Sequence, residues 1–279
     1  MKGRVKDQFS MSEYNGYFRI ATTYDMYNID GLDGWTTNNC IYILDMSLEQ
    51  AGYITDLGFG EEIKSVSFDG NKGYVVTFRN TDPLYSIDLS DPENPVLMDE
   101  LKITGYSSYM QKWDDGFLVG FGESGNEDGE LYGLKLTMFN NSDPNNLEVI
   151  DSIEINSTDP DNFIYSEALY ERKALLISPE HNIIGFPVSS DCWYTDTYQL
   201  ETAYVFYSFE NGKFKELGSI DYVFDEQDQY DSYYHSGFDR VVIIGDFVYA
   251  LSSEMFVSAD IENLNQVDSC GFASDISDE

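Results

Sequence analysis

The stretch Gly73–Ile103 constrains the fold of this chain more than any other. Its first run, Tyr74–Phe78, is β-branched and aromatic, and its second, Leu84–Leu89, places apolar residues at alternate positions. A polar turn then leads into a third run, Val96–Ile103. Because proline fixes φ and cannot donate to a ladder, we expect Pro83 to lie outside the strands. The stretch therefore predicts three successive short β-strands.

The order of strands in this stretch recurs along the chain in five modules. Each module shows an inner strand, a hairpin and an outer strand, and a polar residue follows each third strand. These residues are Asp45, Asp88, Asn140, Glu210 and Asp260. They recur at intervals of roughly 40 to 50 residues, with one longer interval that an insertion at Ser189–Leu200 explains. Four strands in a repeat of this length are typical of a β-propeller blade, whereas a sandwich lacks the higher-order repeat.

The sequence thus predicts an all-β fold, a β-propeller of four-stranded blades. We expect residues 1–279 to form one β-propeller domain, which the length of the chain allows. Five modules do not by themselves show that the ring closes, so the chain can also be part of a larger ring.

The charge of the chain excludes two classes of partner. Fifteen Lys and Arg residues stand against 51 Asp and Glu, which gives a formal charge of −36. Such a charge repels nucleic-acid phosphates and anionic lipid surfaces. It suits solubility in a salty or extracellular medium, and it also suits cation binding. No apolar run approaches the length of a membrane span, so we expect no direct membrane insertion, and the basic start lacks the apolar segment of a signal peptide.

Motifs for catalysis or transition-metal binding are missing from the sequence. The cysteines, Cys40, Cys192 and Cys270, have no CxxC spacing, and their odd count fits either three buried thiols or one disulfide with one free thiol. With only His181 and His235, a multi-histidine metal site is excluded. No GxSxG, HExxH, Walker or EF-hand pattern occurs. Paired carboxylates carry little information among 51 acidic residues.

Several short segments form a recognisable set. They are Val5–Tyr14, Phe18–Thr23, Gly60–Ile63, Tyr74–Arg79, Asp82–Leu84, Ile87–Pro92, Gly133–Lys135 and Gly185–Val188. In these segments the chain resembles a family of secreted bacterial and archaeal proteins with a C-terminal β-propeller domain distantly related to WD repeats. It departs from the family pattern at Ser67, where an arginine is usual, and at Gln111 and Lys112, where a His-Pro pair is usual. The resemblance implies the propeller fold, an extracytoplasmic or secreted location, and a chain that is the C-terminal share of a larger propeller.

Three loops concentrate the hard oxygen ligands that calcium prefers. They are 28–33, 123–130 and 225–231, and the candidate ligands are Glu123, Asn126, Asp128, Glu130, Asp225, Asp228 and Asp231. None of the loops matches a defined calcium motif, so a solvated turn and a calcium site both fit. Calcium is the one cofactor that the sequence suggests.

One face of the predicted propeller gathers aromatic and charged residues. Loops from the second to the third strand of a blade share this face with loops that lead into the next blade. The residues are Trp35, Glu61, Glu62, Arg79, Asp82, Tyr106, Trp193, Tyr194, Tyr230, Tyr233 and Tyr234. Exposed rings beside carboxylates suit peptide or glycan recognition. Trp35 lies in a stretch rich in Asp, Asn and Gly, residues 25–39, which we expect to form a loop. Trp35 and Trp193 are the first candidates, because both lie in insertions that a blade does not need. Alternatively, the tyrosines pack blade against blade and Arg79 pairs with Asp82.

These observations predict a binding or scaffolding module without catalytic activity that recognises a protein or glycan partner. Two alternatives stay open. One is a carbohydrate-active hydrolase that uses carboxylates at the propeller mouth. The other is a calcium-stabilised structural domain. The sequence does not determine the oligomeric state.

Overall fold

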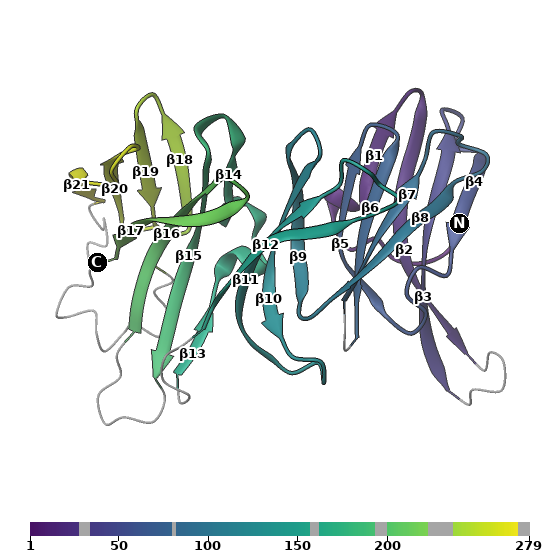
Figure 1. Ribbon diagram of the computed structural model, residues 1–279, viewed down its shortest axis with the longest axis horizontal. Coiled ribbons are helices and arrows are strands. Elements are labelled where there is room, and N and C mark those ends of the chain that lie inside the picture. The colour runs from purple at the N-terminus through teal and green to yellow at the C-terminus, as the bar shows by residue number, and fades with distance from the viewer. Residues whose placement is uncertain (28–33, 80–81, 157–161, 193–199, 223–236, 273–279) are drawn as a thin grey trace, which may run out of the picture. The chain divides into compact units, whose positions relative to one another are not determined.

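The architecture is a series of antiparallel sheets whose strands follow one another in chain order (Figure 1). It is taken from a computed structural model that describes residues 1–27, 34–79, 82–156, 162–192, 200–222 and 237–272. The chain divides into two compact units, unit 1 (Met1–Glu154) and unit 2 (Ile155–Glu279), each considered by itself below. Among the described residues, no helix is long and apolar enough to cross a membrane.

Unit 1 contains three four-stranded sheets, which are the first three predicted blades. Blade 1 consists of β1 (Met11–Tyr14), β2 (Tyr17–Tyr27), β3 (Trp35–Asp45) and β4 (Gln50–Thr55). Blade 2 consists of β5 (Glu62–Asp69), β6 (Lys72–Phe78), β7 (Asp82–Asp88) and β8 (Val96–Ile103). Blade 3 consists of β9 (Tyr106–Asp114), β10 (Phe117–Gly125), β11 (Leu131–Asn140) and β12 (Glu148–Ile155). A short 3₁₀ helix, η1 (Gln8–Ser10), precedes β1.

Unit 2 contains the fourth and fifth blades. Blade 4 consists of β13 (Asn162–Tyr165), β14 (Leu176–Ser178), β15 (Ile183–Cys192), β16 (Leu200–Glu210) and β17 (Lys213–Asp221). Blade 5 consists of β18 (Arg240–Ile244), β19 (Phe247–Leu251), β20 (Met255–Asp260) and β21 (Gln266–Gly271). The sequence therefore predicted the number and order of the blades correctly.

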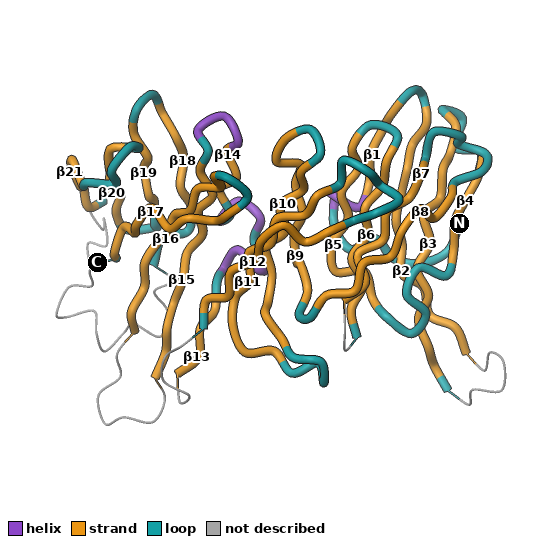
Figure 2. Tube along the Cα trace, in the orientation of Figure 1, coloured by secondary structure: helices purple, strands orange, loops and turns teal. Residues whose placement is uncertain are grey.

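The first strand of blade 4 is split into two pieces, which the sequence did not indicate. β13 pairs with one end of β15 and β14 with the other, and the short helices η2 (Glu167–Leu169) and η3 (Arg172–Ala174) lie between them (Figure 2). Pro187 of β15 lies opposite this gap. Because proline has no N–H to donate, a continuous first strand would lose a ladder bond there.

The repeated turn residue is confirmed in four blades. The side chains of Asp45, Asp88, Asn140 and Asp260 each accept a hydrogen bond from the backbone N–H two residues further on, at 2.8 to 3.1 Å. Such a bond joins a side chain to the backbone two residues further on, so it stabilises the turn by itself. Glu210 instead precedes a tight Asn-Gly turn in which both central residues have positive φ. The five turns thus follow the third strand of each blade, and four of them are stabilised by the same kind of side-chain hydrogen bond.

The core of unit 1 lies between neighbouring blades. Blades 1 and 2 meet through buried aliphatic residues that include Ile41, Val66 and Ile87. Turns of one blade also reach the blade before it: the Ser86 hydroxyl donates to the carbonyl of Pro144 at 2.5 Å. At Gly52, a side-chain Cβ would lie 2.3 Å from a carbonyl oxygen of the next blade's turn, so only glycine fits. Blades therefore hold each other by apolar packing and by backbone contact.

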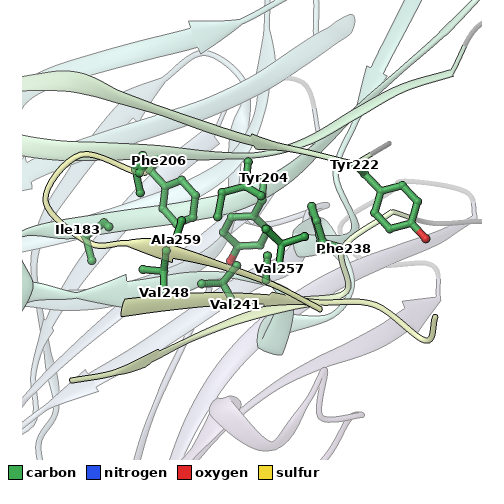
Figure 3. Packing of buried hydrophobic residues seen from close by; sticks show 12 residues of the cluster. Ile183, Tyr204, Phe206, Tyr222, Phe238, Val241, Val248, Val257 and Ala259 are labelled. Carbon is green, nitrogen blue, oxygen red and sulfur yellow. The ribbon is translucent and has the colours of Figure 1, made fainter. Parts of the chain in front are cut away.

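Unit 2 has a separate core between blades 4 and 5. Tyr204 and Phe206 of β16 face Val248, Val257 and Ala259 of blade 5 (Figure 3). The buried Tyr204 hydroxyl donates to the carbonyls of residues 174 and 185 at 2.8 and 3.1 Å, so its polar atom is satisfied. Complete burial raises the pKa of Tyr204 above its usual value.

Two expectations about local structure were wrong. Pro83 lies inside β7, where it pairs with Lys102 of β8, while the ladder to β6 begins only at Leu84. Proline is tolerated there because it is the second residue of the strand and one side of it has no ladder partner. Among the cysteines, Cys40 is a buried free thiol as expected, but Cys270 is free and exposed on β21. The side chain of Cys192 lies outside the described residues.

Candidate functional site

One end of unit 1 collects the candidate residues of blades 1 to 3, and we call it the loop end. Consecutive strands of a blade run in opposite directions. The first and third strands therefore begin at the same end of the blade at which the second and fourth strands finish. The strand termini there are Met11, Tyr27, Trp35, Thr55, Glu62, Phe78, Asp82, Ile103, Tyr106, Gly125, Leu131 and Ile155. Trp35, Glu61, Glu62, Arg79 and Tyr106 all lie at this end. The side chain of Asp82 is outside the described residues.

The most exposed aromatic group at the loop end is a pair of rings, Tyr27 and Trp35. β2 and β3 continue past β1 and β4 as a long hairpin (Figure 1), and these two residues are cross-strand partners. Trp35 is 75% exposed and Tyr27 55%, with ring centroids 5.2 Å apart and ring planes tilted by 52°. The sequence assigned residues 25–39 to a loop and missed Tyr27. Continuing the alternation of β2 past Thr23 would have found it.

The base of this hairpin is fixed by buried polar contacts. The Thr23 hydroxyl donates to Asn39 Oδ1 at 2.6 Å, and Asn39 Nδ2 donates to the carbonyl of Leu57 at 2.7 Å. The Thr37 hydroxyl donates to the carbonyl of Glu61 at 2.8 Å. Satisfied buried networks of this kind restrict motion. The hairpin that carries the two rings is therefore held against the segment 57–61, which leads into blade 2.

A charged group lies beside the hairpin. Arg4 donates to Asp25 of β2 at 3.0 Å and to Glu62 of β5 at 2.6 Å. Its hydrogen bond to Asp25, together with the charges of both carboxylates, raises the pKa of Arg4. A hollow of about 340 Å³ adjoins this group, lined by Lys2, Gly3, Arg4, Thr23, Tyr24 and Asp25. The sequence placed Glu62 on this face but gave no signal for Arg4, because the contact joins residues 58 positions apart.

Glu61 and Arg79 lie on the side of blade 2 that faces blade 1. The Glu61 carboxylate accepts a hydrogen bond from the Thr77 hydroxyl at 2.5 Å. Arg79 is exposed, and a Cβ built on Gly60 would lie 3.5 Å from its Nη1. No ion pair joins Arg79 to a carboxylate of any residue that the structure describes. Arg79 is thus an exposed cation at the loop end.

Tyr106 lies in a second cluster, between blades 2 and 3. Its ring is 4.9 Å from that of Phe78, and the Lys64 ammonium lies 5.4 and 5.9 Å from the centroids of Tyr106 and Phe78. Lys64 is the extra residue of a β-bulge in β5, which directs its side chain out of the regular alternation. The Tyr106 hydroxyl donates to the carboxylate of Glu123. The cluster is half-buried, so Tyr106 is a packing residue more than an exposed ring.

The acidic loop of blade 3 is closed by its own side chains. Asn126 Oδ1 accepts hydrogen bonds from the N–H groups of Asp128 and Glu130, both at 3.0 Å, and its Nδ2 donates to the Glu130 carboxylate at 2.8 Å. Glu123 is engaged by Tyr106. Within the described part of the chain, no three His, Cys, Asp or Glu side chains converge in an arrangement that could hold a metal ion. Calcium binding stays a prediction.

The remaining candidates lie outside the described residues. They are Trp193, Tyr194, Tyr230, Tyr233, Tyr234, Asp225, Asp228 and Asp231. The strands on either side of Trp193 and Tyr194, β15 and β16, are described. In their ladder Ser189 pairs with Thr202, as Thr23 pairs with Asn39 in the ladder of β2 and β3. The two hydroxyls of the blade 4 pair are 3.3 Å apart. Blades 1 and 4 therefore share a long hairpin with a buried polar pair at its base.

A comparison with protein families decides the classification. Residues 1–264 match the model of the beta propeller domain. The chain belongs to this family. Two archaeal relatives are each 38% identical: an uncharacterized protein of Archaeoglobus fulgidus over 190 residues, and one of Methanocaldococcus jannaschii over 187 residues. The matches cover 68% and 67% of this chain but 27% and 28% of the relatives. The chain thus spans about a quarter of the length of these relatives.

Two solved structures are similar to this chain at low sequence identity. The WD40 domain of Pan2 from Neurospora crassa gives a TM-score of 0.47 at 10% identity, covering 92% of this chain and 77% of that domain. A putative dipeptidyl aminopeptidase IV from Bacteroides ovatus gives a TM-score of 0.46 at 12% identity, covering 92% of this chain and 39% of that protein.

Proposed function

We propose that this β-propeller is a non-catalytic binding module that recognises a glycan or protein partner through the loop end of unit 1. The partner contacts the Tyr27 and Trp35 rings first. The module acts outside the cytoplasm as the C-terminal share of a larger propeller, in keeping with the resemblance to secreted proteins and with relatives of which the matched part makes up only 27% and 28%.

The observation that carries the proposal is the exposure of Trp35 on a rigid support. A folded protein usually covers so large an apolar ring, and leaving it in water forgoes roughly 1.5–3 kcal/mol of burial. Here Trp35 is 75% exposed and lies beside a second exposed ring, on a hairpin that runs past its blade. Rings of this kind contribute most of the energy in many binding sites. The support holds them in place before the partner arrives.

The test is the substitution Trp35→Ala with Tyr170→Ala as its matched control. Tyr170 is 83% exposed and belongs to unit 2, so its removal also deletes an exposed ring but leaves the loop end of unit 1 intact. Wild type and both variants are screened against immobilised polysaccharides and a random peptide library. We expect wild type and Tyr170→Ala to bind the same partner, and Trp35→Ala to bind it at least about tenfold more weakly.

Equal binding by wild type and Trp35→Ala would refute the proposal. Release of reducing ends or peptide fragments from a bound partner would contradict the non-catalytic part of it and favour the hydrolase alternative. Circular dichroism of Trp35→Ala checks that the fold is unchanged, as expected for a residue that contributes little to the core.

A further inference from the structure

We infer that the loop end of unit 1 binds a single, uncharged glycan chain, with Tyr27 and Trp35 as the stacking surface and Arg4, Asp25 and Glu62 as the hydroxyl-binding group. The inference rests on the proposed function, because it names the ligand class of the same site. It follows from the position of the charged group relative to the rings, from the pairing within that group, and from the angle between the rings.

The rings and the charged group lie on the same face of the hairpin. Asp25 and Tyr27 are two residues apart in β2, and their cross-strand partners in β3 are Thr37 and Trp35. Alternate residues of a strand project from one face, and at about 3.4 Å per residue the two positions are about 7 Å apart. A sugar ring stacked on the aromatic pair therefore brings its hydroxyl groups toward Asp25 and its partner Arg4.

The pairing within the charged group favours hydroxyls over carboxylates. Arg4 already donates to Asp25 at 3.0 Å and to Glu62 at 2.6 Å. A guanidinium has five N–H donors, so donors remain beside carboxylate oxygens that can still accept. A hydroxyl both donates and accepts, and it can bridge the two kinds of group. A ligand carboxylate would instead meet two carboxylates, on a chain with a formal charge of −36.

The adjoining hollow is large enough for part of such a ligand. Its volume of about 340 Å³ falls at the lower end of the range for small-molecule sites, about 300–1,000 Å³. Its lining includes Arg4 and Asp25, so part of a hydroxylated ligand can reach the charged group there.

The angle between the rings selects a single chain over a flat surface. The Tyr27 and Trp35 planes are tilted by 52°, so both cannot lie flat against one planar face. A crystalline polysaccharide presents such a planar face, whereas a soluble chain can turn to stack one sugar on each ring. We therefore expect binding to soluble neutral glycans and none to crystalline cellulose.

The experiment measures dissociation constants by affinity electrophoresis for glucomannan, galactomannan and laminarin. Each polymer is compared with the same polymer after oxidation of its primary hydroxyls to carboxylates, so charge is the main difference within a pair. Asp25→Asn removes a charged acceptor of the group, and Asp115→Asn is the matched control. Asp115 is also exposed and paired, with Lys112 at 2.8 Å, but it lies in the β9–β10 turn at the opposite end of unit 1.

We expect at least one neutral polymer to bind, with its oxidised form binding at least about tenfold more weakly. Asp25→Asn should also weaken binding of the neutral polymer about tenfold, the effect of one hydrogen bond to a charged group. Asp115→Asn should bind as wild type does. Thermal melts of both variants separate a loss of contact from a loss of fold.

Equal binding of the oxidised polymer, binding to microcrystalline cellulose, or an Asp25→Asn variant that binds as wild type does would each overturn the inference. In these cases a Trp35→Ala variant that still loses binding leaves the proposed function in place. If Trp35→Ala binds every polymer as wild type does, the proposed function fails, and the inference fails with it.

Discussion

Arg19 joins blades 1 and 2 of unit 1 and provides a quantitative test of how the blades hold together. It is 3% exposed, and its guanidinium lies 5.1 Å from the ring centroid of Tyr14 and 4.8 Å from that of Phe68. It donates to the carbonyl of Gly70 at 2.5 Å and to the hydroxyl of Ser12 at 2.7 Å. Two of these partners belong to each blade. We therefore expect substitutions at Arg19 to loosen the contact between them.

The magnitude follows from these contacts. Two hydrogen bonds from a charged donor contribute about 1.5–3 kcal/mol each, and two cation–π contacts about 0.5–2 kcal/mol each. Burial, which lowers the pKa of Arg19, costs several kcal/mol and offsets part of this. Among the described residues, Nε of Arg19 has no hydrogen-bond partner. We expect Arg19→Ala to reduce the free energy of unfolding by about 3–5 kcal/mol. Arg19→Met, which still fills the space between the rings, should cost about 1–3 kcal/mol.

The assay is urea unfolding followed by tryptophan fluorescence in a variant whose other two tryptophans, Trp35 and Trp193, are replaced by Phe, so that the signal comes from Trp113, a buried residue of β9 in unit 1. Lys102→Met is the control, because Lys102 forms an exposed ion pair with Glu100 at 3.4 Å whose loss should change stability by less than about 1 kcal/mol. If both Arg19 variants unfold at the same urea concentration as Lys102→Met, the role assigned to Arg19 is refuted.

Three further predictions concern packing, thiol reactivity and acid stability. Gly52→Ala should cost about 1–3 kcal/mol, because its Cβ would lie 2.3 Å from a carbonyl oxygen; calorimetry with an unchanged Tm would contradict this. Burial raises the pKa of Cys40 to about 11, so a thiol reagent near neutral pH should label Cys270 in the native protein and Cys40 only on unfolding. Hydrogen bonds, first from the Asn94 side chain, lower the pKa of Asp91, so its stabilisation is complete above the ordinary value of 3.8 and is lost as the pH falls through the folded-state value. Urea midpoints should therefore fall less on acidification in Asp91→Ala than in wild type, and equal falls would count against the turn bond.

The blades were predictable from the sequence because their signals are local. Alternating apolar runs and the polar residues at Asp45 and Asp88 recur within each module, and both depend on neighbours a few residues away. The same local patterns do not predict how strands pair. Pro83 fits inside β7 because the ladder to β6 begins only after it, and no local pattern shows where a ladder begins.

The candidate site was only partly predictable for the same reason. Trp35 was recognised because a large ring in an insertion is unusual, but Tyr27 was missed when the polar composition of the hairpin was taken for a loop. Arg4 reaches Glu62 across 58 positions, a contact that arises only when the blades pack. For Tyr106 the sequence left two alternatives open, an exposed ring or packing between blades, and the ring packs against Phe78 of blade 2.

The most direct test of the account is whether the ring of Trp35 meets a ligand. The protein is labelled with 5-fluorotryptophan and titrated with the neutral glycan that it retains best, and each ¹⁹F resonance is assigned with a Trp→Phe variant. The resonance of Trp35 should shift and saturate with the ligand, while that of the buried Trp113 should not move. A saturating titration in which the Trp35 resonance stays in place would contradict the central claim that this hairpin is the binding surface.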